Sequence, residues 1–455
     1  MKRTTLLVVL VTAMAAAAGL PARSALPPLP TGEDYFLVGK VGAGLSRTPG
    51  TLVSEDAWYY LVRISPDAAL AAKAAGFMLK PLPAEPRAPR DLAPLRLPTG
   101  PDTTIERIVA LVSQDSLART ILDLQAFGTR YSYRPTCESA AFYLRGRLAD
   151  LGYSVRMDTY YLPSPHTRSF NVEATLPGAV VPESIVVACG HYDSYSTNFD
   201  SAPGANDDGT GTAAVIELAR VLRQSAYRWT VKFLCFSGEE QWMLGSGHWV
   251  DSTAVPQDLA IAAAFNLDMF GYTPYDTTML YMTRNAASLD LSVLAESANA
   301  CYDIGLNVVN FLDEDCAGDN TPFWNHGYRS VFACEDSEYG IWNGSDPSYH
   351  TPGDTFGYVR MGQVTRTTKL SAACIGALAT PCTVTGISEA GPVLPARATL
   401  APFGRVPATD AQTLRLIAAD GRTVARGRNA TSLPPGIYFA TEPGSGRVWK
   451  FVQLR

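Results

Sequence analysis

Three apolar runs of this 455-residue chain end in acidic or imidazole side chains, and this pattern constrains the fold more than any other feature. The runs and the residues that follow them are 186–190 before His191, 231–236 before Glu239 and Glu240, and 262–267 before Asp268. Short runs rich in β-branched and apolar residues predict buried strands. In an open α/β sheet, ligands bind at the carboxyl edge of the strands. The sequence therefore predicts one crevice lined by carboxylates and histidines.

Helical and strand patterns alternate from about residue 103 to residue 384, which is typical of an α/β protein. Residues 139–151 and 212–222 have the apolar spacing of amphipathic helices. We therefore predict a three-layer sandwich in which helices flank a central mixed, mostly parallel sheet. Short strand-like runs separated by turn residues after residue 386 predict an additional small C-terminal β-sandwich.

Composition shifts divide the chain into five predicted segments. Lys2 and Arg3 precede an apolar run and a group of small residues, as in a signal peptide. Seven prolines in a short stretch oppose regular structure and predict a linker. The segments are a signal peptide at 1–25, an N-terminal module or pro-segment at 26–80, a Pro-rich linker at 81–102, a catalytic domain at 103–384 and a β-sandwich at 386–455.

Charge and hydropathy narrow the choice of partners and location. The formal net charge is −6 and no basic stripe occurs, so we expect no nucleic-acid partner. After the predicted signal peptide, no stretch is long and apolar enough to span a membrane. The sequence thus predicts an exported protein that is secreted or held at the cell surface.

Five side chains are candidate metal ligands, because zinc readily binds imidazole and carboxylate groups. Three are carboxylates, whose charge favours two divalent ions over one, and a shared carboxylate can hold two ions about 3.5–4 Å apart. Glu239 and Glu240 are neighbours at a strand end and project differently, so one can bind metal while the other acts as a general base. The candidate ligands are His191, Asp207, Glu240, Asp268 and His350.

Each motif also has a purely structural interpretation. A His-x-Asp pair is commonly a surface hydrogen bond, the Asp207 loop could be an ordinary turn, and a Glu-Glu pair often begins a solvated helix. His248 and His326 lie outside matching motifs and are given no functional role. The ordered combination favours a functional site. No HExxH motif occurs, which excludes the commonest single-zinc protease arrangement.

The ordered motifs resemble the co-catalytic di-zinc aminopeptidases of metallopeptidase family twenty-eight, of the secreted bacterial leucyl-aminopeptidase type. The resemblance covers about residues 105–384. It implies hydrolysis of the first peptide bond of a peptide with a free N-terminus, by a water molecule that bridges the metal ions. The matching segments are 191–194, 202–211, 236–240, 244–246, 266–269 and 349–355.

The resemblance also implies a role for each residue. Asp207 would bridge two Zn²⁺ ions, with a cis peptide bond after it. The ligands of one ion would be completed by His191 and Asp268, and those of the other by Glu240 and His350. Glu239 would be the general base, and Asp193 would orient a ligand imidazole. One departure concerns Asn320, which stands where the family often has a histidine.

Three competing functions stay open at this stage. A glutaminyl cyclase, which is a single-zinc acyltransferase, shares the fold, but the complete set of Asp207, His191 and Asp268 argues against it. A carboxypeptidase would need a cation for the terminal carboxylate, with Arg284 and Arg329 as candidates. A non-catalytic surface-binding protein would not need a full ligand set and a spare glutamate.

The last segment resembles the C-terminal sorting domain of proteins exported by the type IX secretion route. The matching pieces are 419–422, 433–439 and 450–455. This resemblance implies the secretion machinery as a partner. An accessory sandwich with a purely structural role is the alternative.

Overall fold

The computed structural model describes residues 100–382 apart from 163–165, 273–277, 314–315, 317 and 336–345. It also describes 35–39, 50–55, 59–65, 68–69, 72, 79–82 and 95 before this range, and 415–418, 423–426, 436–441 and 448–453 after it. The predicted signal peptide lies outside the described residues.

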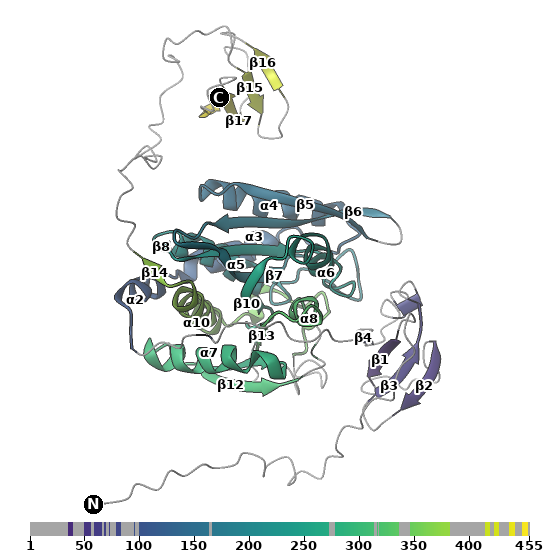
Figure 1. Ribbon diagram of the computed structural model, residues 1–455. Coiled ribbons are helices and arrows are strands. Elements are labelled where there is room, and N and C mark those ends of the chain that lie inside the picture. The colour runs from purple at the N-terminus through teal and green to yellow at the C-terminus, as the bar shows by residue number, and fades with distance from the viewer. Residues whose placement is uncertain are drawn as a thin grey trace, which may run out of the picture. The chain divides into compact units, whose positions relative to one another are not determined.

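An eight-stranded mixed sheet forms the centre of the molecule, in the order β12-β11-β13-β10-β7-β9-β6-β5 (Figure 1). The four pairs β12–β11, β13–β10, β10–β7 and β7–β9 are parallel, and β11–β13, β9–β6 and β6–β5 are antiparallel. The predicted central sheet is thus confirmed. The strands are β5 (Val155–Leu162), β6 (Thr167–Leu176), β7 (Val181–His191), β9 (Trp229–Phe236), β10 (Ala260–Leu267), β11 (Met279–Arg284), β12 (Asn307–Leu312) and β13 (Ser330–Cys334).

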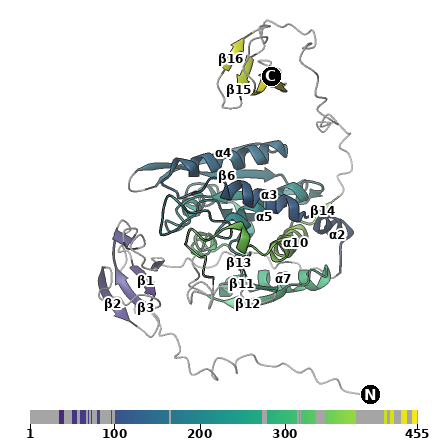
Figure 2. The ribbon, with the colours of Figure 1, turned by 180° about the vertical axis from the view of Figure 1, so that it is seen from behind.

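Helices cover the sheet and supply both outer layers (Figures 1 and 2). The larger core joins α2, α3, α4, α5, α7 and α10 to the sheet, and the smaller core joins α6, η3 and α8 to it. The helices are α2 (Thr103–Ala110), α3 (Gln114–Gln125), α4 (Pro135–Asp150), α5 (Gly209–Leu222), α6 (Leu244–Trp249), the π-helix η3 (Val250–Ala254), the 3₁₀ helix η4 (Ala286–Ser288), α7 (Leu289–Cys301), α8 (Asn320–Asn325), the 3₁₀ helix η5 (Phe356–Tyr358) and α10 (Met361–Ala379).

Strand β7 shows why the sheet is buried on both faces. Val186 and Ala188 belong to the larger core, whereas Val187 and Cys189 belong to the smaller one. Successive side chains of a strand point to opposite faces, so a continuous apolar run serves both layers. The last residue of β7 is His191, which therefore lies at the edge of the sheet where the apolar run ends.

Before the central domain, four strands form an antiparallel sheet in the order β2-β3-β1-β4. They are β1 (Tyr35–Gly39), β2 (Thr51–Glu55), β3 (Tyr59–Arg63) and β4 (Leu79–Leu82). The predicted start of the linker at residue 81 is wrong, because Pro81 pairs with Phe36 in this sheet. Strand β4 is an edge strand, where a proline without an N–H is tolerated.

The C-terminal strands form a separate unit, which divides from the rest of the chain between Val384 and Thr385. Its described strands make one four-stranded antiparallel sheet, ordered β16-β15-β17-β18. They are β15 (Arg415–Ala418), β16 (Thr423–Arg426), β17 (Gly436–Thr441) and β18 (Val448–Gln453). The main unit ends in β14 (Pro381–Cys382), which pairs with β8 (Ala226–Tyr227). Among described residues, no helix has the length and apolar character of a membrane span.

Candidate metal centre

The structure gathers the five predicted ligands into two groups that share Asp207. One group consists of His191, Asp207 and Asp268, and the other consists of Asp207, Glu240 and His350. Within each group, the potential ligand atoms lie within 4.8 Å of one another. We call these five residues the ligand cluster. Their metal ligation stays a prediction.

Asp207 directs one carboxylate oxygen toward each group. Its Oδ1 lies 3.2 Å from His191 Nε2, and its Oδ2 lies 3.3 Å from His350 Nε2. The outer members are similarly close: Asp268 Oδ1 is 3.5 Å from His191 Nε2, and Glu240 Oε2 is 3.1 Å from His350 Nε2. This is the arrangement of a carboxylate shared by two ions.

The neighbouring Asp208 fixes the Asp207 loop between two strands and a helix. The peptide bond between Asp207 and Asp208 is cis. The Asp208 carboxylate caps α5 by accepting a hydrogen bond from Gly211 N at 2.7 Å, and it also accepts from His191 N at 3.1 Å. A Cβ on Gly211 would lie 1.8 Å from the carbonyl oxygen of Leu267, so only glycine allows α5 to begin this close to β10.

Asp193 organises the turn that carries Glu239 and Glu240. Its Oδ1 lies 3.4 Å from His191 Nδ1 and accepts a hydrogen bond from Glu239 N at 3.3 Å. Its Oδ2 accepts from Glu240 N at 3.4 Å and from Ser132 Oγ at 2.7 Å. The predicted contact with a ligand imidazole is therefore present, together with contacts to both glutamates that the sequence did not indicate.

Burial and charge shift the acid–base properties of the cluster. Burial lowers the pKa of His191, but Asp268 and Asp193 outweigh burial and raise this pKa well above its usual value. Burial and the Glu240 carboxylate raise the pKa of Glu239 well above its usual range, although His191 opposes the shift. Burial also raises the pKa of Asp268. These pKa values are raised because several carboxylates lie close together in a space with little water.

The cluster fits metal ions by its geometry and its unsatisfied atoms. Asp207 Oδ2 and Asp268 Oδ1 are buried and accept no well-aligned hydrogen bond. Buried carboxylate oxygens normally have such partners. Ligands about 2.1 Å from a tetrahedral zinc ion lie about 3.4 Å apart, close to the separations found between these side chains. A cation in each group would both satisfy the oxygens and balance the charge.

Asp319 and Asn320 form a second buried polar group beside the cluster. Ser246 Oγ donates to Asp319 Oδ1 at 2.5 Å, and burial raises the pKa of Asp319 to about 7. Asn320 is fully buried, and neither of its side-chain polar atoms has a hydrogen-bond partner. The sequence indicated only that Asn320 departs from a family pattern, and we assign it no role.

Sequence reasoning missed several residues that support the Asp207 loop. Asp354 accepts hydrogen bonds from the backbone N–H groups of Asn206 and Asp207, at 2.8 and 2.9 Å. Asn206 Nδ2 donates to Glu335 Oε1 at 2.8 Å. Arg130 is fully buried behind the same loop. Asp354 and Asn206 had a sequence signal, because they lie in the matching segments 349–355 and 202–211, whereas Glu335 and Arg130 had none.

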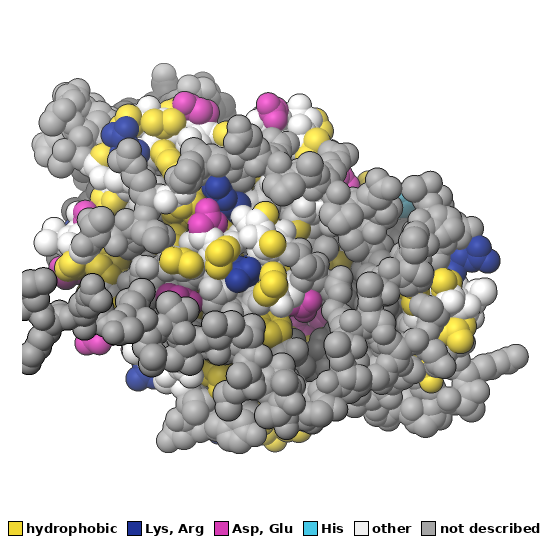
Figure 3. All heavy atoms as spheres, turned by 60° about the horizontal axis from the view of Figure 1, so that its bottom comes forward, with side chains coloured by type: hydrophobic (Ala, Val, Ile, Leu, Met, Phe, Trp, Pro, Cys, Tyr) yellow, Lys and Arg dark blue, Asp and Glu magenta, His cyan; other side chains and the backbone are white. Residues whose placement is uncertain are grey.

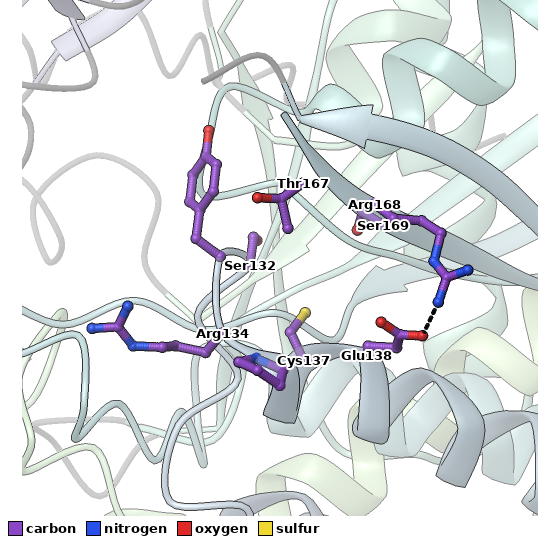
Figure 4. A pocket seen from close by; sticks show the side chains of 9 residues that line it. Ser132, Arg134, Cys137, Glu138, Thr167, Arg168 and Ser169 are labelled. Atoms are coloured by element: carbon purple, nitrogen blue, oxygen red, sulfur yellow. Dashed lines mark hydrogen bonds and ion pairs between the residues drawn. The ribbon is translucent and has the colours of Figure 1, made fainter. Parts of the chain in front are cut away.

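A cavity of about 160 Å³ lies next to Ser132, the residue that donates to Asp193. Figure 4 shows Cys137 near its centre, and Glu138 paired with Arg168. Burial raises the pKa of the Cys137 thiol to about 12, so the thiol is neutral near pH 7. Because its cations face carboxylates and its thiol is protonated, we assign the cavity no chemistry.

Comparison with known proteins finds similarity to one family over much of the central domain. Residues 171–375 match the family described as Peptidase family M28. The aminopeptidase YwaD of Bacillus subtilis is 32% identical over 184 residues, which are 40% of this chain and 38% of that protein. A probable zinc metalloprotease of Leptosphaeria maculans is 27% identical over 52% of this chain and 67% of its own length. The chain thus spans less than half of the Bacillus aminopeptidase it matches.

Solved structures show the same fold at lower identity. The LapA aminopeptidase of Legionella pneumophila superposes with a TM-score of 0.59 at 18% identity, covering 76% of this chain and 98% of that one. A glutaminyl cyclase of Fimbriiglobus ruber superposes with a TM-score of 0.50 at 18% identity, covering 58% of this chain and 95% of that one. The fold is therefore shared by two different activities, and the site must distinguish them.

Proposed function

We propose that the chain is a zinc-dependent aminopeptidase that binds two zinc ions and removes residues one at a time from the free N-terminus of peptides. The observation that carries this proposal is the position of Asp207, whose two carboxylate oxygens face one histidine each. The family match, the aminopeptidase relative and the zinc metalloprotease relative support the same interpretation.

Bound zinc would polarise the scissile carbonyl group and increase the acidity of water. The Glu239 carboxylate would accept a proton from the attacking water and return it to the leaving amine. Asp193 would hold Glu239 in place through the Glu239 N–H group. The raised pKa of Glu239 suits a group that must both take up and release a proton.

Acidic groups beside the ligand cluster would favour a substrate with a free N-terminus. Glu239 and Asp319 add carboxyl groups beside the three carboxylates of the ligand cluster, and each acts electrostatically on its neighbours. A protonated α-amine would be attracted to such a site, and an acylated N-terminus would not. Each cleavage would therefore take place at the first peptide bond.

The carboxypeptidase alternative loses its two candidate cations. Arg284 donates to Asn310 of β12, and Arg329 lies 3.1 Å from Asp290 of α7. Neither Asn310 nor Asp290 lies on a strand or helix that carries a residue of the ligand cluster. The cyclase alternative is disfavoured because both groups of potential ligands are complete.

We also propose that the protein acts outside the cytoplasm, on the strength of the signal-like residues 1–25. The C-terminal unit would then be either a secretion signal or an accessory domain. Figure 3 shows one face of the molecule, on which described Lys and Arg side chains are scattered among acidic and apolar ones. Because the formal net charge is −6, we include no nucleic-acid partner in the proposal.

Zinc counting combined with matched peptide substrates tests this function. Elemental analysis should find two zinc ions per chain. A peptide amide with a free N-terminus should be cleaved at its first bond, and its N-acetylated form should not. Cleavage that requires a free carboxyl terminus would support a carboxypeptidase instead. One zinc ion together with pyroglutamyl formation from an N-terminal glutamine would support a cyclase.

Limited proteolysis between residues 82 and 102 separates the two interpretations of residues 26–80. A rise in activity after cleavage would support a removable pro-segment. Aggregation of the remaining chain would support a permanent module.

A further inference from the structure

Arg130 lies in the loop between α3 and α4, with no exposed side-chain surface. Its guanidinium donates four hydrogen bonds, and all of them go to backbone carbonyl oxygens. The acceptors are Tyr192 at 2.6 Å, Leu124 at 3.2 Å, Pro203 at 2.5 Å and Gly204 at 2.8 Å. Burying a charged group is unfavourable unless it is well hydrogen-bonded, so this position places a strong demand on the side chain.

Three of the four acceptors belong to the two segments that carry key ligands. Tyr192 lies between His191 and Asp193, whereas Pro203 and Gly204 precede Asp207 in the loop before α5. One rigid planar group therefore contacts both segments at once. A lysine could not reproduce the contacts, because its ammonium is a single point with three donors and lacks the planar fork.

The same loop makes further contacts to both segments. Arg130 N donates to Ser194 Oγ at 3.0 Å, and Ser132 Oγ donates to Asp193 Oδ2 at 2.7 Å. On the other side, Thr129 forms a bridge with Ala202. We call residues 129–132 the clamp loop.

We infer that Arg130 is a positioning residue, which holds the His191–Asp193 segment and the Pro203–Asp207 segment at the separation required for Asp207 to share its carboxylate between two metal ions. This inference rests on the proposed function. The inference goes beyond that function, because the guanidinium of Arg130 donates only to backbone carbonyl groups and to no ligand side chain. Asp207 can serve two metal ions only if both imidazoles lie within a few ångströms of its carboxylate. A small shift of either segment would therefore weaken metal binding by both ligand groups.

Zinc affinity measured without peptide tests the inference. In Arg130→Lys, zinc affinity should fall at least ~10-fold, the lower end of the loss seen when groups that orient metal ligands are removed. With zinc saturating, kcat should fall while KM stays nearly unchanged, because the substitution acts through the positions of the metal ligands. Arg134→Lys is the matched control. Arg134 is in the next turn of the chain, pairs with Asp200 at 2.8 Å and extends away from Ser132 (Figure 4).

A merely structural role would give a different result. It would lower the thermal unfolding temperature of the zinc-free and zinc-loaded protein equally and leave zinc affinity unchanged, and this result overturns the inference. If Arg130→Lys does not fold, Ser132→Ala replaces it, since that change removes only one clamp-loop hydrogen bond to Asp193. Reduced zinc affinity in Ser132→Ala supports the clamp loop, and wild-type affinity overturns it.

The two proposals can fail separately. If the wild-type protein binds two zinc ions but cleaves no peptide, the proposed function fails and the zinc-affinity comparison still decides the role of Arg130. If the wild type is an active aminopeptidase and Arg130→Lys binds zinc as tightly and turns over as fast, only the positioning role fails.

Discussion

Two buried carboxylate clusters lie on the same sheet, and they differ in how their charge is balanced. The ligand cluster contains three carboxylates and two imidazoles at the ends of strands. The second, which we call the Glu173 cluster, consists of Glu173, Arg156, Lys232 and Trp249. In the Glu173 cluster, two cations and an indole N–H surround one carboxylate.

Glu173 has its partners within the protein. Arg156 Nη2 lies 2.6 Å from Glu173 Oε2, Trp249 Nε1 donates to the same oxygen at 3.0 Å, and Lys232 pairs with Oε1. By contrast, Asp207 Oδ2 and Asp268 Oδ1 accept no hydrogen bond. Burial of acidic residues thus indicates a binding site only where the protein does not supply the compensating charge.

The largest expected effect comes from removing the shared carboxylate. Asp207→Asn should lose both zinc ions and reduce peptidase activity by more than about 1,000-fold, because metal ions supply several kcal/mol of transition-state stabilisation. Elemental analysis and peptide hydrolysis measure the two effects. Asp158→Asn is the control, since Asp158 is buried beside Arg156 and outside the ligand cluster. Retention of both ions in Asp207→Asn would contradict the shared-ligand geometry.

Glu239→Gln should separate catalysis from metal binding. We expect two bound zinc ions and at least ~100-fold slower turnover, the scale of lost general-base catalysis. The matched change, Glu240→Gln, should instead lower zinc content, because Glu240 belongs to a ligand group. If Glu239→Gln loses zinc and Glu240→Gln keeps it, the roles of the two glutamates are reversed.

Breaking the Glu173 cluster should affect stability without affecting zinc. Glu173→Gln should lower the free energy of unfolding by about 1.5 kcal/mol near pH 7, because it leaves the part-buried Lys232 without its counter-charge, whereas Arg156 is half-exposed and keeps Asp158. Chemical denaturation of the zinc-loaded protein measures this loss. Zinc content should remain at the wild-type value, and a loss of zinc would show that the two clusters are not independent.

The effect of Glu173→Gln should also depend on pH. Burial alone would raise the pKa of Glu173, but Lys232, Trp249 and Arg156 outweigh burial and lower it below its usual value. A group with a lowered pKa in the folded state stabilises the protein above its unfolded-state pKa, and this stabilisation is lost as the pH falls through the folded-state pKa. The stability difference between wild type and Glu173→Gln should therefore narrow below about pH 4. If the stability difference between wild type and Glu173→Gln does not change with pH, the substitution acts through packing and not through charge.

The sequence predicted the ligand cluster because its signals are local. Apolar runs that end at His191, Glu239 and Asp268 mark strand ends, and strand ends of one sheet edge converge. The layer architecture follows from the same runs. Asp193 was also predicted to lie beside a ligand imidazole, since it is two residues from His191 and lies at hydrogen-bonding distance.

The supporting residues could not be predicted in this way, because their partners are distant in sequence. Arg130 contacts carbonyl groups more than sixty residues away, and Asp354 contacts Asn206 across 148 residues. The strand order was likewise not predictable, since β11 lies between β12 and β13 and is antiparallel to β13. For Pro81 the sequence predicted a linker, because proline opposes regular structure, but Pro81 lies in the edge strand β4.

Removing residues 386–455 should have the smallest effect, because both clusters lie within the unit that ends at Val384. We expect two zinc ions per chain, peptidase activity within about twofold of the full chain, and the same response to Glu173→Gln. A longer deletion from residue 361 is the control: it removes α10, whose buried residues include Leu370, Cys374 and Leu378, so it should abolish folding. Loss of zinc in the shorter deletion would mean that the C-terminal unit supports the ligand cluster. If stability falls while zinc is retained, the C-terminal unit stabilises the central domain without supporting the ligand cluster.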